Sequence, residues 1–350
     1  MSCLSFGLAC GGGDSAGTSE DESAYGGETA DDSTTGSDLT SAHAVTGFKA
    51  LETPVSRVLS QDLTALLPVG ASVPARSTVT ATRSLSLEGT PAYLVVAEPS
   101  MRSLVVKKSD FDAAAAAGTS VFTSTLKEHV QAPLSRVLVA DAAQEMAVSI
   151  DMCQSSKAWD LALFDWLRQV GRAIGAPVPV AIAMTGGWAK AHGPQLLQLI
   201  GWHAAKELDI VWVNHSYTHP LNCNAAKTSC AFLTAPSVDF LAEVTENEKL
   251  LLGQGAVPSA LFRFPGLVHD SGRRSQLSGL SLFALDADTW LAKGQPTHDG
   301  SLILVHGNGN EPPGISKFFS LAEQGHWLDQ AKAGKLRFVS PLRTISAAAQ

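Results

Sequence analysis

The stretch from residue 146 to residue 339 alternates short apolar runs with longer segments of helical spacing. The runs that we expect to form strands are residues 146–150, 178–184, 210–213, 261–264, 282–285, 302–305 and 336–339. The segments that we expect to form helices are residues 159–174, 194–208, 238–252 and 315–333. Strands that alternate with helices of this length predict an α/β fold with a parallel sheet, either a barrel or an open sheet. In both, reacting groups gather at the carboxyl ends of the strands.

Polar and aromatic residues recur at those expected strand ends. They are Asp151, Trp188 after Gly186-Gly187, the pair His215 and His219, Arg263, Asp288 with Trp290, and His306. Each alone has an ordinary structural interpretation, such as a helix cap, a surface ion pair or a core aromatic residue. Because a parallel fold brings the strand ends together, the set as a whole predicts a functional site.

The two histidines follow the apolar run Val211-Trp-Val-Asn214 and stand four residues apart. If the chain becomes helical after Asn214, residues at this spacing share one face, so both rings reach one point. Histidine is the commonest metal ligand, and a catalytic zinc site takes three protein ligands and leaves one position open. A pair of this kind is not specific by itself, so a third ligand must come from elsewhere in the fold.

The order of the motifs resembles that of the polysaccharide deacetylases, the NodB-homology family also called carbohydrate esterase family 4. The motifs are Ser149-Ile-Asp151, His215-Ser-x-x-His219, Arg263-x-Pro265, Asp288-x-Trp290 and Leu302-Ile-Leu304-Val-His306. The match covers roughly residues 146–345. It implies a distorted (β/α) barrel with an incomplete strand count. It also implies a divalent metal, Zn²⁺ in our reading, and removal of acetyl groups from a polysaccharide such as peptidoglycan or a chitin-like glycan.

The resemblance also implies a role for each matching residue. Asp151 would be the general base, Arg263 would orient this base, and His215 and His219 would bind the metal. His306 would be the acid that protonates the departing amine, with Asp288 as its partner. Leu304 and Trp290 would form the walls of an acetyl pocket. The family places this aspartate directly before the tryptophan, whereas Thr289 intervenes here.

Met152 is a larger departure, because the family has a second, metal-binding aspartate at this position. A thioether is a poor ligand for zinc. Three alternatives follow: Asp151 is the third ligand, Cys153 binds as a thiolate, or the metal is weak or absent and the domain is a binding relic. We favour a retained metal with Asp151 near it, because the other motifs are in place.

Two other functions compete with the deacetylase interpretation. The first is a non-catalytic carbohydrate-binding protein in which Trp188 and Trp290 stack on sugar rings. The second is a hydrolase of a small amide on the same fold.

Composition narrows the classes of partner. The 350 residues, 45% of them hydrophobic, suffice for one sizeable core and a smaller module. A net charge of -8 without a Lys/Arg-rich run argues against nucleic acid and anionic membrane surfaces as partners. No apolar run approaches the roughly twenty residues of a transmembrane helix.

Residues 1–10 resemble the end of a bacterial lipoprotein signal, with Leu8-Ala9 leading to Cys10. The apolar part is short and lacks a basic n-region, which a start codon further upstream would explain. Residues 11–45 are rich in Gly, Ser, Thr, Asp and Glu, which predicts a flexible tether. These features suggest a lipid anchor at Cys10 and a protein of the bacterial cell envelope, lipid-anchored, periplasmic or secreted. The alternative is a disordered acidic N-terminus of a soluble protein.

Two further segments carry predictions. Residues 46–112 contain short β-prone runs, which predict a small antiparallel barrel that loosely resembles a bacterial SH3-like domain. Residues 113–145 form a connector with a helical piece around Leu126. Cys223 and Cys230 flank a polar loop and either form a disulfide in an oxidising compartment or stay free thiols.

Overall fold

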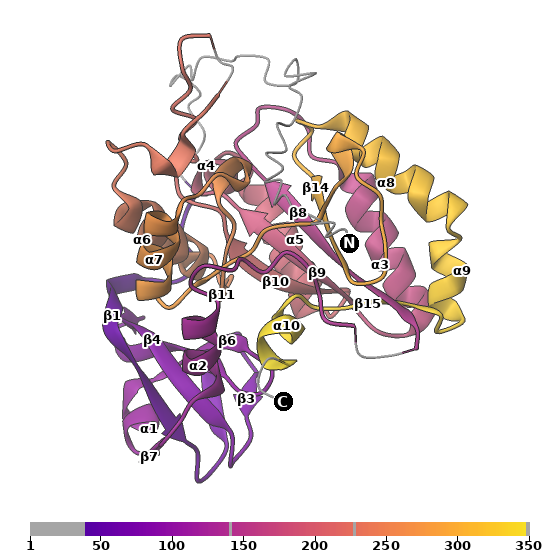
Figure 1. Ribbon diagram of the computed structural model, residues 1–350. Helices are drawn as coiled ribbons and strands as arrows, with labels where there is room; N and C mark the ends of the chain where they lie inside the picture. The colour runs from indigo at the N-terminus through magenta and orange to yellow at the C-terminus, as the bar shows by residue number, and fades with distance from the viewer. Residues whose placement is uncertain (1–38, 140–141, 227–228, 348–350) are drawn as a thin grey trace, which may run out of the picture. The chain divides into compact units, whose positions relative to one another are not determined.

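The computed structural model describes residues 39–139, 142–226 and 229–347 (Figure 1). The expectations for residues 1–10, for the lipid anchor at Cys10 and for most of the tether fall outside these ranges. Two sheets account for the strands of the described chain, one parallel and one antiparallel. None of the helices placed in these ranges has the length and apolar character needed to cross a membrane.

The parallel sheet confirms the predicted α/β class. Its strands are β8 (Gln144–Met152), β9 (Val178–Met184), β10 (Leu208–Asn214), β11 (Pro258–Phe262), β12 (Phe283–Ala284), β13 (Thr289–Trp290), β14 (Ser301–His306) and β15 (Leu336–Phe338). They follow the order β12-β11-β10-β9-β8-β14-β13, with β15 beside the start of β8. Seven of these strands lie close to the runs expected from sequence, and the two-residue strand β13 was not expected.

The expected connector links the two sides of this sheet. The Leu134 N–H donates to the Ala284 carbonyl (2.8 Å) beside β12, and the Val137 N–H donates to Gly300 (3.0 Å) before β14. The segment thus bridges the two edges of the curled sheet, which has the form of an incomplete barrel.

Helices cover the outer face of the sheet. They include α3 (Leu161–Ile174), α5 (Gly193–Ala204), α8 (Pro312–Gln324) and α9 (Trp327–Lys332), seen beside the strands in Figure 1. The single helix expected over 315–333 is two helices. The break follows from Gly325, where a Cβ atom would lie 2.6 Å from the Trp327 ring, and from His326, whose φ is 49°.

The remaining helices lie in the connections. They are α1 (Lys108–Asp112), α2 (Val121–Glu128), α4 (Gly186–Ala191), α6 (Phe240–Gly253), α7 (Ser271–Gly279) and α10 (Leu342–Ala347), with short 3₁₀ turns at Phe232–Thr234, Pro265–Leu267 and Leu291–Lys293. Of these, α6 matches the expected helix at 238–252 and α2 the helical piece around Leu126.

Strand alternation decides which side chains face the helices. Successive residues of a strand point to opposite faces. Met146, Val148, Ile150 and Met152 of β8 pack in the core between sheet and helices. Their neighbours, including Asp151, therefore face the concave side of the sheet, which puts polar chemistry inside the barrel and not under the helices.

The antiparallel sheet contains strands β1 (Val45–Val58), β2 (Leu63–Leu67), β3 (Ser72–Val73), β4 (Thr78–Leu87), β5 (Thr90–Ala97), β6 (Arg102–Lys107) and β7 (Ala115–Ala116). Its order is β3-β2-β6-β5-β4-β1-β7. The β-rich character expected for residues 46–112 is present. The likeness to an SH3-like domain stays a prediction.

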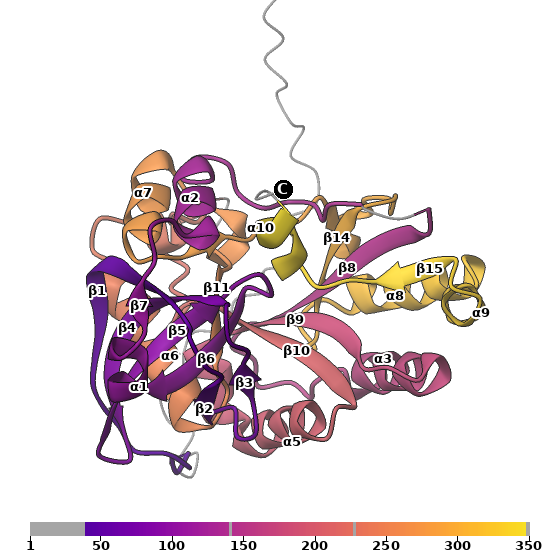
Figure 2. The ribbon, with the colours of Figure 1, turned by 90° about the horizontal axis from the view of Figure 1, so that it is seen from below.

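This antiparallel sheet packs directly on the α/β body, as the view from below shows (Figure 2). Val96 and Met101 share a core cluster with Ala181 and Val211 of the parallel sheet. Residues 39–44, which we expected to be part of the tether, also contact this body: the His43 N–H donates to the Gly253 carbonyl at 2.9 Å. The antiparallel sheet and the α/β body therefore share buried clusters of apolar residues.

Candidate metal and catalytic site

Two strand ends bring Asp151 and His306 side by side. β8 and β14 are parallel neighbours, and their register pairs His306 with Asp151. Both side chains belong to the concave face, because the residues that alternate with them, Ile150 and Val305, lie in the helix-facing core. The two groups that were expected to move protons thus sit together at the carboxyl end of the sheet.

Arg263 follows β11 and is fully buried. Its Nη1 donates to Asp151 Oδ1 at 2.9 Å, its Nη2 to Ser149 Oγ at 2.9 Å, and its Nε to the Leu285 carbonyl at 2.7 Å. Because the guanidinium is held from three directions, it fixes the Asp151 carboxylate through one oxygen. The second oxygen, Oδ2, stays open and lies 3.7 Å from His215 Nε2.

The loop that carries the two histidines is not helical, which corrects the helical turn expected after Asn214. It is instead a bend in which Ser216 (φ 69°) and His219 (φ 49°) take left-handed backbone conformations. The two rings nevertheless meet, with centroids 4.9 Å apart. The convergence was predicted correctly, but through the wrong local geometry.

Helix α6 holds this loop from outside. Glu243 accepts hydrogen bonds from the Tyr217 and Thr218 N–H groups, both at 2.9 Å. Asn247 Nδ2 donates to Asn214 Oδ1 at 2.8 Å, and that oxygen also accepts the Ser216 N–H. These contacts satisfy a turn that has no regular backbone ladder of its own.

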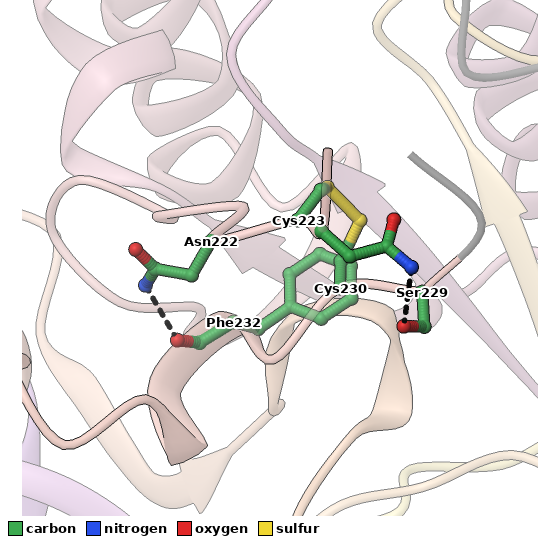
Figure 3. The surroundings of a disulfide bond; sticks show 6 residues. Asn222, Cys223, Ser229, Cys230 and Phe232 are labelled. Atoms are coloured by element: carbon green, nitrogen blue, oxygen red, sulfur yellow. Dashed lines mark hydrogen bonds between the residues drawn. A yellow bond between two sulfur atoms is a disulfide. The ribbon is translucent and has the colours of Figure 1, made fainter. Parts of the chain in front are cut away.

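A disulfide supports the second histidine from another direction. Cys223 and Cys230 are bonded, which decides between the two alternatives left open by the sequence (Figure 3). Beside the bridge, Asn222 Nδ2 donates to the Phe232 carbonyl at 2.8 Å. The Phe232 ring packs edge-on against His219, with centroids 5.9 Å apart. The bridged loop thus positions an apolar wall behind the His219 ring.

Cys153 completes a cluster of metal-binding atoms. In the described chain, Cys153 Sγ and one ring nitrogen each of His215 and His219 all lie within 4.8 Å of one another. Cys153 Sγ is 3.4 Å from His215 Nε2. Within the same part of the chain, the buried His219 Nε2 has no hydrogen-bond partner. A soft and borderline donor set with an unsatisfied imidazole fits a divalent metal.

The tautomer of His215 also suits this role. Its Nδ1 lies 2.8 Å from the Arg263 carbonyl, and only a protonated Nδ1 can donate there. In the neutral ring, Nε2 therefore carries the lone pair toward Cys153. A carbonyl behind a ligating histidine is the usual second partner in metal sites.

The charges in the cluster attract a cation. Burial alone would raise the pKa of the Cys153 thiol, but His219, His215 and His306 together bring this pKa well below its usual value. Burial likewise lowers the pKa of His215, yet Cys153 and Asp151 raise it overall. A thiolate beside a carboxylate thus favours positive charge at this point.

The geometry bears on two expectations for the third ligand. Asp151 is not among the residues whose donor atoms cluster within 4.8 Å, although it borders them. Met152 is fully buried and faces away, with its sulfur near the backbone of Gly307. The third donor in the cluster is Cys153, and Asp151 as a possible third ligand stays a prediction, because its Oδ2 lies 3.7 Å from His215 Nε2.

His306 has a carboxylate partner that sequence reasoning missed. Its Nδ1 lies 2.7 Å from Glu311 Oε2, and the same oxygen accepts from Trp290 Nε1 at 3.0 Å. Burial would lower the pKa of His306, but Cys153 and Glu311 raise it well above its usual value. Glu311 lies in the turn before α8, five residues after His306, and no motif marks it.

Asp288 is not that partner. Its carboxylate lies 3.0 Å from His298 Nε2 and 3.2 Å from Arg136 Nε, and it accepts the Leu302 N–H at 2.9 Å. Thr289, which intervenes before Trp290, faces Ser301 in the buried layer (3.0 Å). With this extra residue in the motif, Asp288 belongs to the joint between β13 and β14 and not to the site.

Trp188 is also placed elsewhere. Its side chain is fully buried in the helix-facing core and stacks on His192 with centroids 4.7 Å apart. A ring with no exposed face cannot stack on a sugar, so its predicted substrate contact is wrong. Trp290 and Leu304, by contrast, are register partners beside His306, where the expected acetyl pocket would lie.

Comparison with known proteins gives structural matches. No family model matches the sequence. A family 4 carbohydrate esterase from Bacillus anthracis is 16% identical with a TM-score of 0.46, covering 67% of this chain and 94% of that one. Bacillus subtilis PdaA, also a family 4 carbohydrate esterase, is 13% identical (TM-score 0.45; 67% and 92%). The chitin deacetylase of Colletotrichum lindemuthianum is 18% identical (TM-score 0.40; 59% and 90%). The first two of these descriptions print family 4 carbohydrate esterases.

Proposed function

We propose that the protein is a metal-dependent hydrolase that removes acetyl groups from a polysaccharide. The substrate we propose is a polymer of N-acetylglucosamine, such as peptidoglycan or a chitin-like glycan, by resemblance of the motifs to family 4 carbohydrate esterases. One observation carries the proposal: Asp151 and His306 end adjacent strands beside a cluster of three metal-binding side chains.

The metal would be held by the donor atoms of Cys153, His215 and His219. When bound, such a divalent cation, Zn²⁺ in our proposal, would lower the pKa of water and polarise the acetyl carbonyl.

Asp151 acts as the general base. Arg263 binds Oδ1 and orients the carboxylate, and Oδ2 lies on the side of His215. Oδ2 accepts a proton from the attacking water while the water oxygen forms a bond to the acetyl carbon. A positioned base or acid contributes typically about 10²- to 10⁴-fold to such a step.

His306 acts as the acid. Cys153 and Glu311 favour its protonated form, and Nδ1 lies 2.7 Å from Glu311 Oε2, so Nε2 is the nitrogen that would donate. As the carbon–nitrogen bond breaks, the amide nitrogen takes this proton, and the products are acetate and a free amine. Trp290 and Leu304 would form the wall for the acetyl methyl group, since both are buried apolar side chains next to His306.

We also propose that the protein works in the bacterial cell envelope. The Cys223–Cys230 disulfide supports an oxidising compartment. A lipid anchor at Cys10 belongs to the same proposal and rests on the sequence alone.

The test uses the full chain, with acetate release from peptidoglycan and chitin fragments and metal content by mass spectrometry. We expect His215→Ala to lose both the bound metal and acetate release. His43→Ala is the matched control, because this histidine contacts the Gly253 backbone outside the site. Unchanged turnover in His215→Ala would refute the assignment.

The replacement of the family's aspartate by Met152 favours one other candidate, a non-catalytic carbohydrate-binding protein. It predicts a chain that binds the glycan in sedimentation with the insoluble polymer but contains no metal and releases no acetate. Release from N-acetylglucosamine monomers with none from polymer would instead indicate a small-amide hydrolase.

A further inference from the structure

The cluster of metal-binding atoms contains a sulfur where a carboxylate was expected. Cys153 follows Met152, the last residue of β8, and does not share its core-facing side. Asn308 Nδ2 donates to the Cys153 carbonyl at 2.9 Å and holds the backbone at this point. The side chain is only 9% exposed, so its sulfur faces the histidines and not solvent.

The distance between the donors suits a single metal ion. Zinc binds sulfur at about 2.3 Å and imidazole nitrogen at about 2.0–2.1 Å, so two such ligands of a tetrahedral ion lie about 3.6 Å apart. Cys153 Sγ and His215 Nε2 are 3.4 Å apart. His219 completes the group within 4.8 Å. The strands and the histidine loop already bring the three donor atoms together.

Neither neighbour of Cys153 belongs to this group of donor atoms. The Asp151 carboxylate is bound by Arg263 and lies outside the group. The Met152 side chain belongs to the core between sheet and helices. A thiolate therefore supplies the anionic ligand, and the aspartate keeps a free oxygen for proton transfer.

We propose that Cys153 is the third protein ligand and that its sulfur makes the site selective for thiophilic divalent ions. Zn²⁺, Co²⁺ and Cd²⁺ bind, whereas Mg²⁺, Mn²⁺ and Ca²⁺, which prefer oxygen ligands, do not compete. The proposal rests on the metal site of the proposed function and specifies its cofactor class.

The test has a readout that does not need activity. Metal-free full-length protein is titrated with Co²⁺, and the near-ultraviolet absorption is recorded. A cobalt–thiolate bond gives an intense charge-transfer band there, which nitrogen and oxygen ligands do not give. We expect this band at one equivalent of Co²⁺, and we expect Zn²⁺ to displace it while Mn²⁺ and Mg²⁺ do not.

Variants identify the sulfur. Cys153→Ser removes the band and weakens Zn²⁺ binding by more than the roughly 10- to 100-fold seen for residues that only support a ligand. Cys153→Asp removes the band but binds Mn²⁺ better than the original protein does, because it restores an oxygen donor. The double variant Cys3→Ser, Cys10→Ser is the control for the two cysteines outside the described chain and keeps the band.

The outcomes separate this inference from the proposed function. A wild-type protein that binds Co²⁺ without the band, or a Cys153→Ser variant with unchanged Zn²⁺ affinity, overturns the thiolate ligand. Deacetylation survives that result if His215→Ala still abolishes metal binding and acetate release. A protein that shows the band but releases no acetate from either glycan keeps the metal site and loses the deacetylase.

Discussion

The molecule contains two buried pairs of arginine and carboxylate that differ in how the carboxylate is used. Arg83 in β4 and Glu248 in α6 are each 1% exposed, and the guanidinium binds both oxygens, Nε to Oε2 at 2.7 Å and Nη2 to Oε1 at 2.9 Å. Arg263 binds only Oδ1 of Asp151. We call the first pair closed, because the arginine binds both carboxylate oxygens. We call the second pair open, because Arg263 binds one oxygen of Asp151 and the other lies toward the metal-binding cluster.

The difference shows that a buried arginine–carboxylate pair can serve either structure or chemistry. A buried pair with all its atoms engaged fixes how two parts of the chain dock, and here it joins the antiparallel sheet to α6. A buried pair with a free oxygen holds a reactive group in one orientation. Both pairs need hydrogen bonds beyond their partner, because burial of a charge costs several kcal/mol unless its remaining atoms are satisfied.

The open pair is tested by Asp151→Asn. The amide keeps an oxygen for Arg263 but cannot accept the proton, so we expect acetate release to fall by about 10²- to 10⁴-fold. Metal content by mass spectrometry stays at the wild-type value, because the ligands are other residues. Loss of the metal in this variant would show that Asp151 is a ligand and not the base.

The closed pair is tested by Arg83→Met. This change leaves the Glu248 charge buried without a partner, so the free energy of unfolding in urea falls by about 3–5 kcal/mol. Acetate release per folded molecule stays constant. The double variant Arg83→Met, Glu248→Leu should recover most of the loss, since no charge stays buried. A single variant as stable as the wild type would contradict the role given to this pair.

A third, less buried pair extends the comparison and carries the smallest expected effect. Glu311 raises the pKa of His306, and Glu311→Gln removes its negative charge, so this pKa falls. His306 then loses its proton at lower pH, and the alkaline limb of the profile of kcat/KM against pH moves toward acid. Glu323→Gln, at an exposed position on α8, is the control and leaves the profile unchanged. An unshifted limb in Glu311→Gln would remove Glu311 from the acid step.

Most strands of the parallel sheet could be predicted, because the pattern that marks a strand and its end lies within a few consecutive residues. The run at residues 178–184 is β9 to the residue. Strand β1 escaped notice because Gly47 and Pro54 interrupt its alternation, and α7 because its sequence is mostly polar. These elements are held by contacts with the rest of the fold, which a local pattern does not contain.

The site could be predicted only in part, because only some of its residues lie next to a strand with a clear pattern. Asp151, His215, His219, Arg263 and His306 lie at strand ends, and all five meet. Met152 has the same parity in β8 as Met146 and packs with it in the helix-facing core, so its direction agrees with strand alternation. Cys153 and Glu311 lie in irregular loops, where neither period nor spacing fixes direction, and Asp288 was displaced by a single inserted residue.

Helix α6 has a consequence for any attempt to shorten the protein. Within two turns it carries Glu243, which anchors the histidine loop, and Glu248, which receives Arg83 from the antiparallel sheet. A chain trimmed to begin near residue 141 would leave an orphaned carboxylate and a bare apolar surface beneath the barrel. The antiparallel sheet thus supports the histidine loop through α6. A shortened protein that keeps this support begins no later than residue 39.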